Sequence, residues 1–322
     1  MIKVRCNPTP PQITIYVAKS EKALDGLTKV TKAEWELEKA VVFFTDPANY
    51  ADDAKKTKAK FSFRVYQDSD LAAELEKVFG KKCAYCESRF AHVTSKDIEH
   101  YRPKAEIDTG QGTLQPGYFW LGGEWQNLLI SCPHCNRVRH HKVPGQPEEI
   151  KLGKGTQFPL ADEKLRVRNQ GDVNGEDPVR LLLNPRVDDP QEHLTFDADA
   201  LIHPRADANG QPSAKGSASI TAYALQRAEL VNERLVVLNR LELRVMDLND
   251  LIETHNDLIA HGLDTTRNAA QIKRIKEEID QMFAANAPYL AMLREWIRRA
   301  KQRGDFARIE QLHIDLAVLG QE

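Results

Sequence analysis

A carboxylate stands directly beside an imidazole, Glu99 then His100, in the stretch "KDIEHYRPKAEI" at residues 96–107. A carboxylate can hold a cation, and an imidazole, which titrates at about pH 6 to 7, can take a proton from water. Most Glu-His neighbours are surface residues without such a role. The motifs around the pair therefore decide whether it has a chemical function.

Two CxxC pairs flank this stretch: Cys83 and Cys86 in "KKCAYCESRF", and Cys132 and Cys135 in "SCPHCNRV". Four thiolates at this spacing are typical of one tetrahedral zinc ion, and they leave no open position for water, so the predicted zinc is structural. The segment between the pairs is longer than in a usual zinc ribbon, so the metal would clamp the two ends of an inserted element. The alternative is four unligated buried cysteines. We interpret Cys6 as an ordinary thiol.

Further polar side chains lie within and just after the inserted element. Asn127 lies in "WQNLLIS", and Asn136, Arg139 and His140 lie in "CNRVRHHK". If a helix starts after the second CxxC pair, Asn136 and His140 share one face, and Arg139 is close to that face. A carboxylate, an amide oxygen and an imidazole could then converge on one divalent cation. Hydrolysis of a phosphodiester needs such a set: a base for the water, a cation, and basic side chains that position the backbone.

The order of these motifs resembles the HNH nuclease motif of the ββα-metal fold. The resemblance runs through "CAYCE", "EHYRPK", "CPHCN", "FPL", "LLLNPRVDDP" and "HLTFDADALIHP", over about residues 80–205. Over this range the chain is similar to the HNH subunit of Septu-type and retron-associated anti-phage systems (PtuB-like). The resemblance implies a metal-dependent endonuclease that leaves a 5′-phosphate and acts beside an ATPase partner. The sequence has no GxxxxGK[ST] loop, so an ATP-driven step would belong to that partner.

The resemblance also implies roles for the central residues. It makes His100 the general base and makes Glu99 and Asn136 ligands of a catalytic ion, Mg²⁺ or Mn²⁺, with Ni²⁺ or Zn²⁺ also open. Asn127 corresponds to the middle asparagine, which shapes the loop and helps to orient the base. Two alternatives remain open. Glu99 and His100 point to opposite faces of a regular strand and act together only at a strand end, and Asn136 could merely cap a helix.

Three residues after the second CxxC pair complete the implied site. His140 falls where some family members supply a further metal-binding histidine, and His141 could replace it if the helix begins one residue later. Arg139 falls where many members carry a basic residue that faces the phosphate. The chain departs from the commoner family pattern at Glu99, where Asp is usual.

Composition bounds the class of protein. The chain has 322 residues, 41% hydrophobic and 29% charged, with a net charge of −2, which is typical of a soluble globular protein with two or three modules. No apolar run reaches the roughly 20 residues of a membrane span and there is no apolar signal core, so we expect a cytoplasmic protein without a membrane partner. Because the net charge is near zero, a nucleic-acid surface must be local. The predicted basic cluster consists of Arg102, Lys104, Arg137, Arg139, His140, His141 and Lys142.

The fold class expected is α+β, with a zinc-stapled ββα-metal core in a largely α-helical protein. The predicted parts are an N-terminal mixed region at 1–79, the nuclease domain at 80–161, a loop-rich connector at 162–216 and a helical region at 217–322. The first part should contain a strand at "ITIYV" and helices near 31–43 and 70–79. Alternation in "HLTFDADALIH" predicts a β-hairpin in the connector.

The last part shows a heptad pattern. No Pro or Gly interrupts residues 219–261, and apolar residues recur every seven positions, which predicts one long helix with an apolar seam. The seam residues are Val231, Leu238, Val245, Ile252 and Ile259, with Leu241 and Leu248 offset by three. Further helices are predicted at 267–285, 288–302 and 305–319. The helix that covers the seam could come from this chain or from a second subunit of a homo-oligomer, and the region is also a candidate docking surface for the ATPase partner.

These observations leave three functions open. The first is an HNH endonuclease that cuts DNA. The second is a zinc-stapled nucleic-acid-binding or adaptor module with an inactive site, which needs the cysteines but neither Glu99 nor His100. The third is a nuclease that acts on RNA, because no reader module in the sequence separates RNA from DNA.

Overall fold

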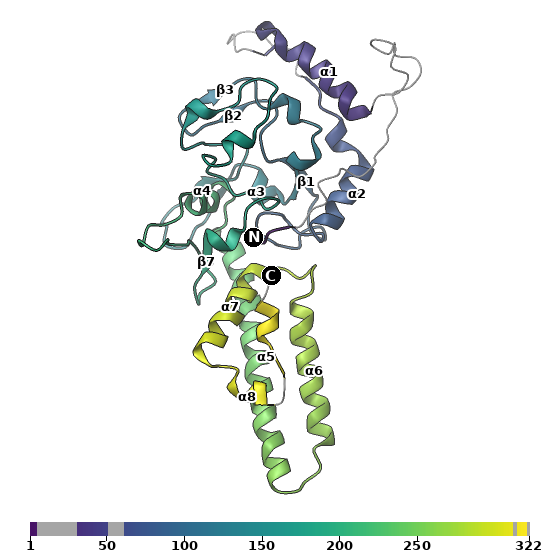
Figure 1. The fold of residues 1–322 in the computed structure, drawn as a ribbon, viewed down its shortest axis with the longest axis vertical. Helices are drawn as coiled ribbons and strands as arrows, with labels where there is room; N and C mark the ends of the chain where they lie inside the picture. The colour runs from purple at the N-terminus through teal and green to yellow at the C-terminus, as the bar shows by residue number, and fades with distance from the viewer. Residues whose placement is uncertain (5–30, 51–60, 312–313, 321–322) are drawn as a thin grey trace.

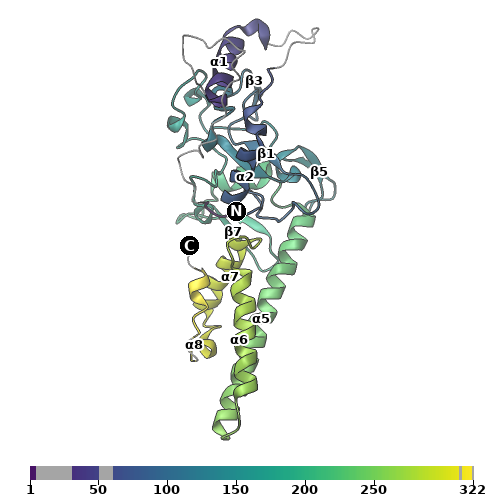
Figure 2. The same ribbon diagram turned by 90° about the vertical axis from the view of Figure 1, so that its right-hand side faces the viewer.

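The computed structural model describes residues 1–4, 31–50, 61–311 and 314–320. Short helices, loops and small sheets make up one half of the molecule, and a long antiparallel helix pair, α5 with α6, extends away from it (Figures 1 and 2). The strand predicted at "ITIYV" lies outside the described residues. Within the described ranges, no helix is both long and apolar enough to cross a membrane.

The two N-terminal helices form where the sequence predicts them. Helix α1 (Lys32–Thr45) begins at a capping box, in which the Thr31 hydroxyl and the Glu34 carboxylate each accept from the backbone amide of the other residue. Helix α2 (Ser69–Val78) begins at Asp68, whose side chain accepts from the Asp70 amide. These local side-chain bonds satisfy amide groups that a helix start otherwise leaves unpaired.

All named strands of the described chain occur in antiparallel pairs, and no pair joins another into a larger sheet. The pairs are β1 (Asp97–His100) with β4 (Leu128–Ser131), β2 (Ile107–Asp108) with β3 (Thr113–Leu114), β5 (Arg139–His141) with β6 (Ile150–Leu152), and β7 (Leu194–Phe196) with β8 (Ile202–Pro204). The pair β7–β8 lies in the segment whose alternation predicts a hairpin. Short 3-10 helices occur at Pro47–Asn49, Val65–Gln67, Phe119–Leu121, Trp125–Asn127, Glu163–Leu165, Asn174–Glu176, Pro190–Glu192 and Ala317–Gly320.

Helix α3 (Pro133–Asn136) is much shorter than predicted. The expectation that one helix carries Asn136 and His140 on the same face is wrong, because the chain leaves the helix at Asn136 and His140 lies in strand β5. The backbone amides of Lys154 and Gly155 donate to the last carbonyls of α3, at 2.9 and 2.6 Å, and so take acceptors that a longer helix would use. Gly153 makes this approach feasible, since a Cβ there would lie 2.2 Å from a carbonyl oxygen at the end of α3.

The C-terminal helices also differ from the prediction at one point. The long helix predicted from Ser219 onward is interrupted at residues 223–227, although no Pro or Gly lies there. The Tyr223 ring stacks on Tyr85 with 3.8 Å between ring centroids, and its hydroxyl donates to the Leu183 carbonyl at 2.8 Å. Packing therefore breaks the helix where the local sequence does not. The observed helices are α4 (Ala214–Ala222), α5 (Ala228–Ala260), α6 (Thr266–Met282), α7 (Leu290–Arg303) and α8 (Ala307–Gln311), the last much shorter than the predicted 305–319.

The heptad seam of α5 is covered from within the chain. The described structure packs α5 along α6, and α7 and α8 also contact it (Figure 1). Ile259, near the end of the predicted seam, is 58% exposed, so the seam stops short of the hairpin tip. The buried residues on α5 are Leu230, Val231, Arg234, Leu238, Leu241, Val245, Leu248 and Ile252, and those on α6 are Asn268, Ile272, Ile275, Ile279 and Met282.

One apolar core runs through both halves. It includes residues of the first CxxC pair, of strand β4 and of helices α5, α6 and α7. A second, smaller cluster joins α1 to the loop after β3 through Phe44, Phe63 and Phe119. The elements that carry Glu99 and His100 therefore rest on the same core as the helical hairpin.

Candidate active site and metal centre

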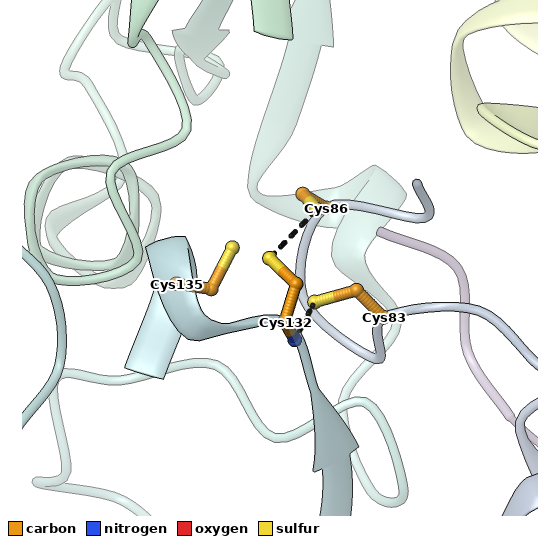
Figure 3. Close-up of side chains that lie close together, drawn as sticks. All are labelled: Cys83, Cys86, Cys132 and Cys135. Carbon is orange, nitrogen blue, oxygen red and sulfur yellow. Dashed lines mark hydrogen bonds between the residues drawn. The ribbon is translucent and has the colours of Figure 1, made fainter. Parts of the chain in front are cut away.

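The four cysteines of the two CxxC pairs come together in one buried cluster (Figure 3). Their sulfur atoms all lie within 4.8 Å of one another. The sulfurs of Cys86 and Cys132, one from each pair, lie 3.9 Å apart. No disulfide links any of the four. The predicted convergence of these cysteines is thus confirmed.

This cluster could hold a metal ion such as zinc. Four thiolates around a tetrahedral zinc ion stand roughly 3.8 Å apart, because each zinc–sulfur bond is about 2.3 Å long, so only a small contraction separates the cluster from that geometry. Burial raises the pKa of the Cys83 and Cys135 thiols well above the usual value. A cation that binds here must therefore displace protons from the thiols, and its affinity should fall as pH falls.

The cluster also holds the strand pair that carries the Glu-His motif. The Ala84 amide, inside the first CxxC pair, donates to the Ile130 carbonyl of β4 at 2.8 Å. The Cys132 amide, directly after β4, donates to the Cys83 sulfur at 3.3 Å. Because β4 pairs residue for residue with β1, the cysteine cluster sets the position of Glu99 and His100.

His100 is the last residue of β1 and is 5% exposed. Its Nε2 lies 2.9 Å from the Gly122 carbonyl oxygen, which can only accept, so Nε2 carries the proton. Its Nδ1 lies 3.1 Å from the Lys104 ammonium and accepts from it. Burial lowers the pKa of His100 well below its ordinary range, and the charge of Lys104 lowers it further. His100 is thus neutral at pH 7, with the lone pair of a base on Nδ1.

Only glycine fits at the position that orients this ring. A Cβ at Gly122 would lie 2.6 Å from the Phe63 ring. The Tyr66 ring meets the His100 ring edge-on, with 4.8 Å between centroids, and the Lys104 ammonium lies 4.3 Å from the centre of the Tyr66 ring. Burial lowers the pKa of Lys104 to about 8. The imidazole is therefore held on three sides, by a carbonyl, an aromatic ring and an ammonium group.

Glu99 pairs with a lysine that is distant in sequence. The Lys154 ammonium, fully buried, lies 2.5 Å from the Glu99 carboxylate and also donates to the His100 carbonyl at 2.9 Å. Burial raises the pKa of Glu99, and the positive charge of Lys154 opposes that rise. Lys154 thus supplies positive charge beside the carboxylate and ties it to the end of β1.

Asn127 binds backbone only. Its side-chain oxygen accepts from the Arg102 amide at 2.7 Å, and its side-chain nitrogen donates to the carbonyls of Arg102 and Leu121 at 3.0 and 3.1 Å. These bonds hold the turn after His100 against the loop that contains Gly122. Asn127 therefore lies where it can shape the loop around the base.

Asn136, the last residue of α3, contacts the first residue of β1, at the end opposite to His100. Its side-chain nitrogen donates to the Asp97 carboxylate at 3.0 Å, and Arg137 binds the same carboxylate through two nitrogens at 2.9 and 2.6 Å. Asp97 and Glu99 are two residues apart in the strand and so point to one face. That face of β1 carries two carboxylates, one bound to Asn136 and the other bound to Lys154.

The histidines of β5 point in opposite directions. Arg139 and His140 are exposed, whereas His141 is buried, with its Nε2 unpaired and its ring 5.5 Å from the His134 ring. His140 pairs across the ribbon with the exposed Lys151 of β6. Of the two histidines weighed as ligands, only His140 is thus available at the surface.

The predicted basic cluster is smaller than expected. The sequence predicts Arg102 as a member, but Arg102 is buried, and its guanidinium donates to the Glu176 carboxylate at 3.0 Å and to Asp177 at 3.3 Å. Lys104 is half-buried against His100, and His141 faces inward. The exposed members that remain are Arg137, Arg139, His140 and Lys142, all on or beside the β5–β6 ribbon.

The three predicted ligands of a catalytic ion have different partners in this arrangement. Glu99 binds Lys154, Asn136 binds Asp97, and His140 faces outward from β5. In the described part of the chain, the cysteine cluster is the sole group of three or more His, Cys, Asp or Glu side chains whose ligand atoms converge. The carboxylate and amide oxygens near β1 are donors that Mg²⁺ and Mn²⁺ prefer, but the trio does not fit one ion without rearrangement.

Sequence reasoning missed Lys154 and gave Lys104 only a place in the basic cluster. Both ammonium groups lie at the Glu-His pair, one beside each side chain. Lys154 stands between two glycines with positive φ, Gly153 and Gly155, in "LGKGTQ". Glycines on both sides of a lysine are a signal that the backbone must approach another segment closely there.

Comparison with known proteins decides the family. No model of a known protein family matches the sequence. The chain is 36% identical to Septu protein PtuB of Bacillus mycoides (strain KBAB4) over 279 residues, which cover 81% of this chain and 88% of that protein. The chain belongs to the PtuB family of Septu proteins. The predicted resemblance to PtuB-like Septu proteins is thereby confirmed.

A second similarity concerns a different Septu protein. Over 165 residues, 51% of the chain, it is 26% identical to Septu protein PtuA of the same organism, and the match spans 20% of PtuA. A member of the PtuB family thus shares part of its sequence with a PtuA protein.

Proposed function

We propose that this PtuB-family protein is a metal-dependent HNH endonuclease that hydrolyses phosphodiester bonds of DNA. In this proposal β1, β4 and α3 are the ββα core, and the cysteine cluster holds the structural zinc. His100 is the general base, Asn127 shapes its loop, and Arg139 contacts the phosphate backbone.

The state of His100 carries the proposal. A general base needs a lone pair, a fixed direction and a neutral form at working pH. The Gly122 carbonyl fixes the proton on Nε2 and leaves Nδ1 as the acceptor, while burial keeps the ring neutral. An ordinary surface histidine beside a glutamate lacks the fixed tautomer and the fixed direction.

The reaction follows from this assignment. Nδ1 of His100 takes a proton from water as the water oxygen bonds to phosphorus, the bond to the 3′ oxygen breaks, and that oxygen takes a proton from solvent. The product then carries a 5′-phosphate, as the family resemblance implies. Lys104 now donates to Nδ1, so it has to release that nitrogen before a water can use it.

The catalytic ion belongs to the proposal because phosphodiester hydrolysis develops negative charge that a cation offsets. Mg²⁺ or Mn²⁺ is proposed, with Glu99 and Asn136 as donors and His140 as a further one. Lys154 lies at the Glu99 carboxylate, so Glu99 can bind the ion only if that contact opens. The contact of Asn136 with Asp97 uses the amide nitrogen and not the amide oxygen that would bind the ion.

We also propose that the protein acts in anti-phage defence together with an ATPase partner. The family resemblance implies such a partner, and the similarity to Septu protein PtuA makes a PtuA-type protein the first to test. The C-terminal helices remain a candidate surface for that contact.

Cleavage of supercoiled plasmid tests the proposal. We expect wild type to cut with Mg²⁺ or Mn²⁺ in the presence of the PtuA-type partner. His100→Ala should cut at a rate reduced by about 100-fold or more, the usual loss when a general base is removed. His203→Ala is the matched control, because His203 is an exposed histidine paired with Asp197. Zinc content, measured by mass spectrometry, should be equal in all three proteins.

Two outcomes would contradict the proposal. Equal cutting by wild type and His100→Ala would remove His100 from the chemistry. Plasmid binding without cutting under any condition would favour the adaptor module with an inactive site. The separate partners of Glu99 and Asn136 are consistent with such a module. RNA substrates would be tested next.

A further inference from the structure

Arg227 lies at the cysteine cluster although it is more than ninety residues from the second CxxC pair. It directly precedes α5, and the residue is 5% exposed. The guanidinium nitrogens lie 3.5 Å from the Cys135 sulfur, 3.6 Å from Cys86 and 3.9 Å from Cys132. One side chain thus reaches sulfurs of both CxxC pairs.

The charge of a filled cluster explains why a buried cation would lie there. Four thiolates with one divalent ion carry a net charge of −2, and a buried net charge is costly unless it is paired. Arg227 is the cation that touches the sulfurs in the described structure, and its remaining bond, to the Ala224 carbonyl at 2.9 Å, is to backbone. Arg234 is also buried but donates to the Leu225 carbonyl and not to a sulfur.

The same residue stands where the chain turns from α4 into α5. The break between these helices lies at residues 223–227, with Tyr223 stacked on Tyr85 of the first CxxC pair. The Ala228 amide, the first of α5, donates to the Lys142 carbonyl at 2.8 Å, just after β5. Arg227 offers no side-chain cap to α5, because its guanidinium points to the cluster instead. The start of the long helix is therefore built onto the metal centre.

We propose that Arg227 is a positioning residue of the metal centre: it donates hydrogen bonds to three thiolates, slows loss of the metal and docks the start of α5 onto the cluster. Metal binding and docking of the helical hairpin are then coupled, and the coupling acts in both directions. Removal of the metal loosens the first turn of α5, and loss of the guanidinium weakens metal binding. The link holds whether or not the chain cuts nucleic acid.

Zinc release from the full chain tests the first direction. The variants are Arg227→Met, which keeps much of the side-chain volume, and Arg227→Lys, which keeps the charge but has one donor group. Arg240→Met on the exposed side of α5 is the control. Relative to wild type, transfer of zinc to 4-(2-pyridylazo)resorcinol should be faster by about tenfold or more for Arg227→Met. The rate should be intermediate for Arg227→Lys and unchanged for the control.

A cobalt-substituted protein separates this role from simple packing. Hydrogen bonds to a thiolate stabilise its lone pairs, so their loss moves the sulfur-to-cobalt charge-transfer band to lower energy. We expect that shift in Arg227→Met and not in Arg240→Met. Unchanged zinc release together with an unchanged cobalt band would overturn the proposal.

The effect of metal removal on the start of α5 can be tested in the wild-type protein, so this test does not depend on whether a variant folds. Amide hydrogen exchange over residues 228–234 should accelerate when the metal is removed by a chelator, while exchange in the middle of α5 and α6 should change less. If exchange at the first turn of α5 is the same with and without metal, the coupling does not exist.

Discussion

The half of the molecule around β1 and the helical hairpin α5–α6 are held together in different ways. Around β1, buried charged side chains find partners far away in sequence, such as Lys154 on Glu99 and Glu176 on Arg102. Along α5 and α6 most buried residues are Leu, Ile or Val, and the exceptions are Arg234, Asn268 and Met282. The first half therefore depends on specific partners, and the second depends on apolar area that many side chains share.

The difference has an energetic consequence. A buried charge that loses its partner keeps its full desolvation cost, so one substitution can undo the region around it. A seam residue that loses methyl groups costs its own transfer free energy and a cavity, while its neighbours keep their contacts. Changes to the metal centre and the buried ion pairs should thus exceed changes to the seam.

Removal of the metal should have the largest effect. A structural zinc site contributes roughly 10 kcal/mol or more of binding free energy, and the zinc proposed at the cysteine cluster would hold β4 and thereby β1. We expect chelation to abolish the near-ultraviolet circular dichroism of the stacked Tyr85 and Tyr223, while most far-ultraviolet helical signal persists. Readdition of zinc should restore the spectrum. An unchanged near-ultraviolet spectrum in metal-free protein would show that the half around β1 does not depend on the metal.

Substitution of Glu176 should come next. Glu176 is fully buried and accepts from Arg102, from the Tyr118 hydroxyl at 2.8 Å and from the Val167 amide at 2.9 Å. Glu176→Gln removes the buried counter-charge of Arg102 and leaves it only the partly exposed Asp177, which we expect to lower the free energy of unfolding by about 3 to 5 kcal/mol. Denaturant unfolding followed in the near-ultraviolet measures it.

An exposed ion pair in the same half provides the control for that substitution. Glu74 pairs with Lys77 at 2.5 Å on the surface of α2. Glu74→Gln should change the free energy of unfolding by less than about 1 kcal/mol, because solvent screens the pair. Equal losses for the two substitutions would show that burial of the Arg102 pair does not matter.

The seam of the hairpin should respond least. Leu248 is fully buried on α5, which packs along α6, so Leu248→Ala should cost about 2 to 5 kcal/mol, with the lower end expected where the helices can close the cavity. Leu243 is 59% exposed on the same helix, and Leu243→Ala should cost about 0.5 kcal/mol or less. Far-ultraviolet unfolding curves compare the two. A larger loss at Leu243 would mean that its face of α5 is covered in solution.

Much of the hairpin and part of the site could be predicted from sequence. The heptad spacing of Leu238, Val245 and Ile252 marks one face of a helix, and periodicity of that kind depends on the local chain alone. The CxxC spacing predicts a shared metal because the ligand types and their spacing restrict the geometry. The capped starts of α1 and α2 were also predictable, since the capping residues are adjacent to the turns that they satisfy.

Other features were decided by contacts between distant segments. Helix α3 ends at Asn136 because the amides of residues 154 and 155 take its carbonyls, and the break before α5 forms where Tyr223 stacks on Tyr85. Arg102 is buried because Glu176 lies beside it.

The amino-acid sequence by itself determined the elements whose cause is local: the capped helices, the apolar seam and the paired cysteines. Only the tertiary structure decided which buried charge meets which partner, such as Lys154 at Glu99 and Arg227 at the cysteines. The physical reason is that a hydrophobic period repeats every turn and can be read along the chain. A buried ion or hydrogen bond instead needs one partner at one distance, and that partner can come from anywhere in the sequence.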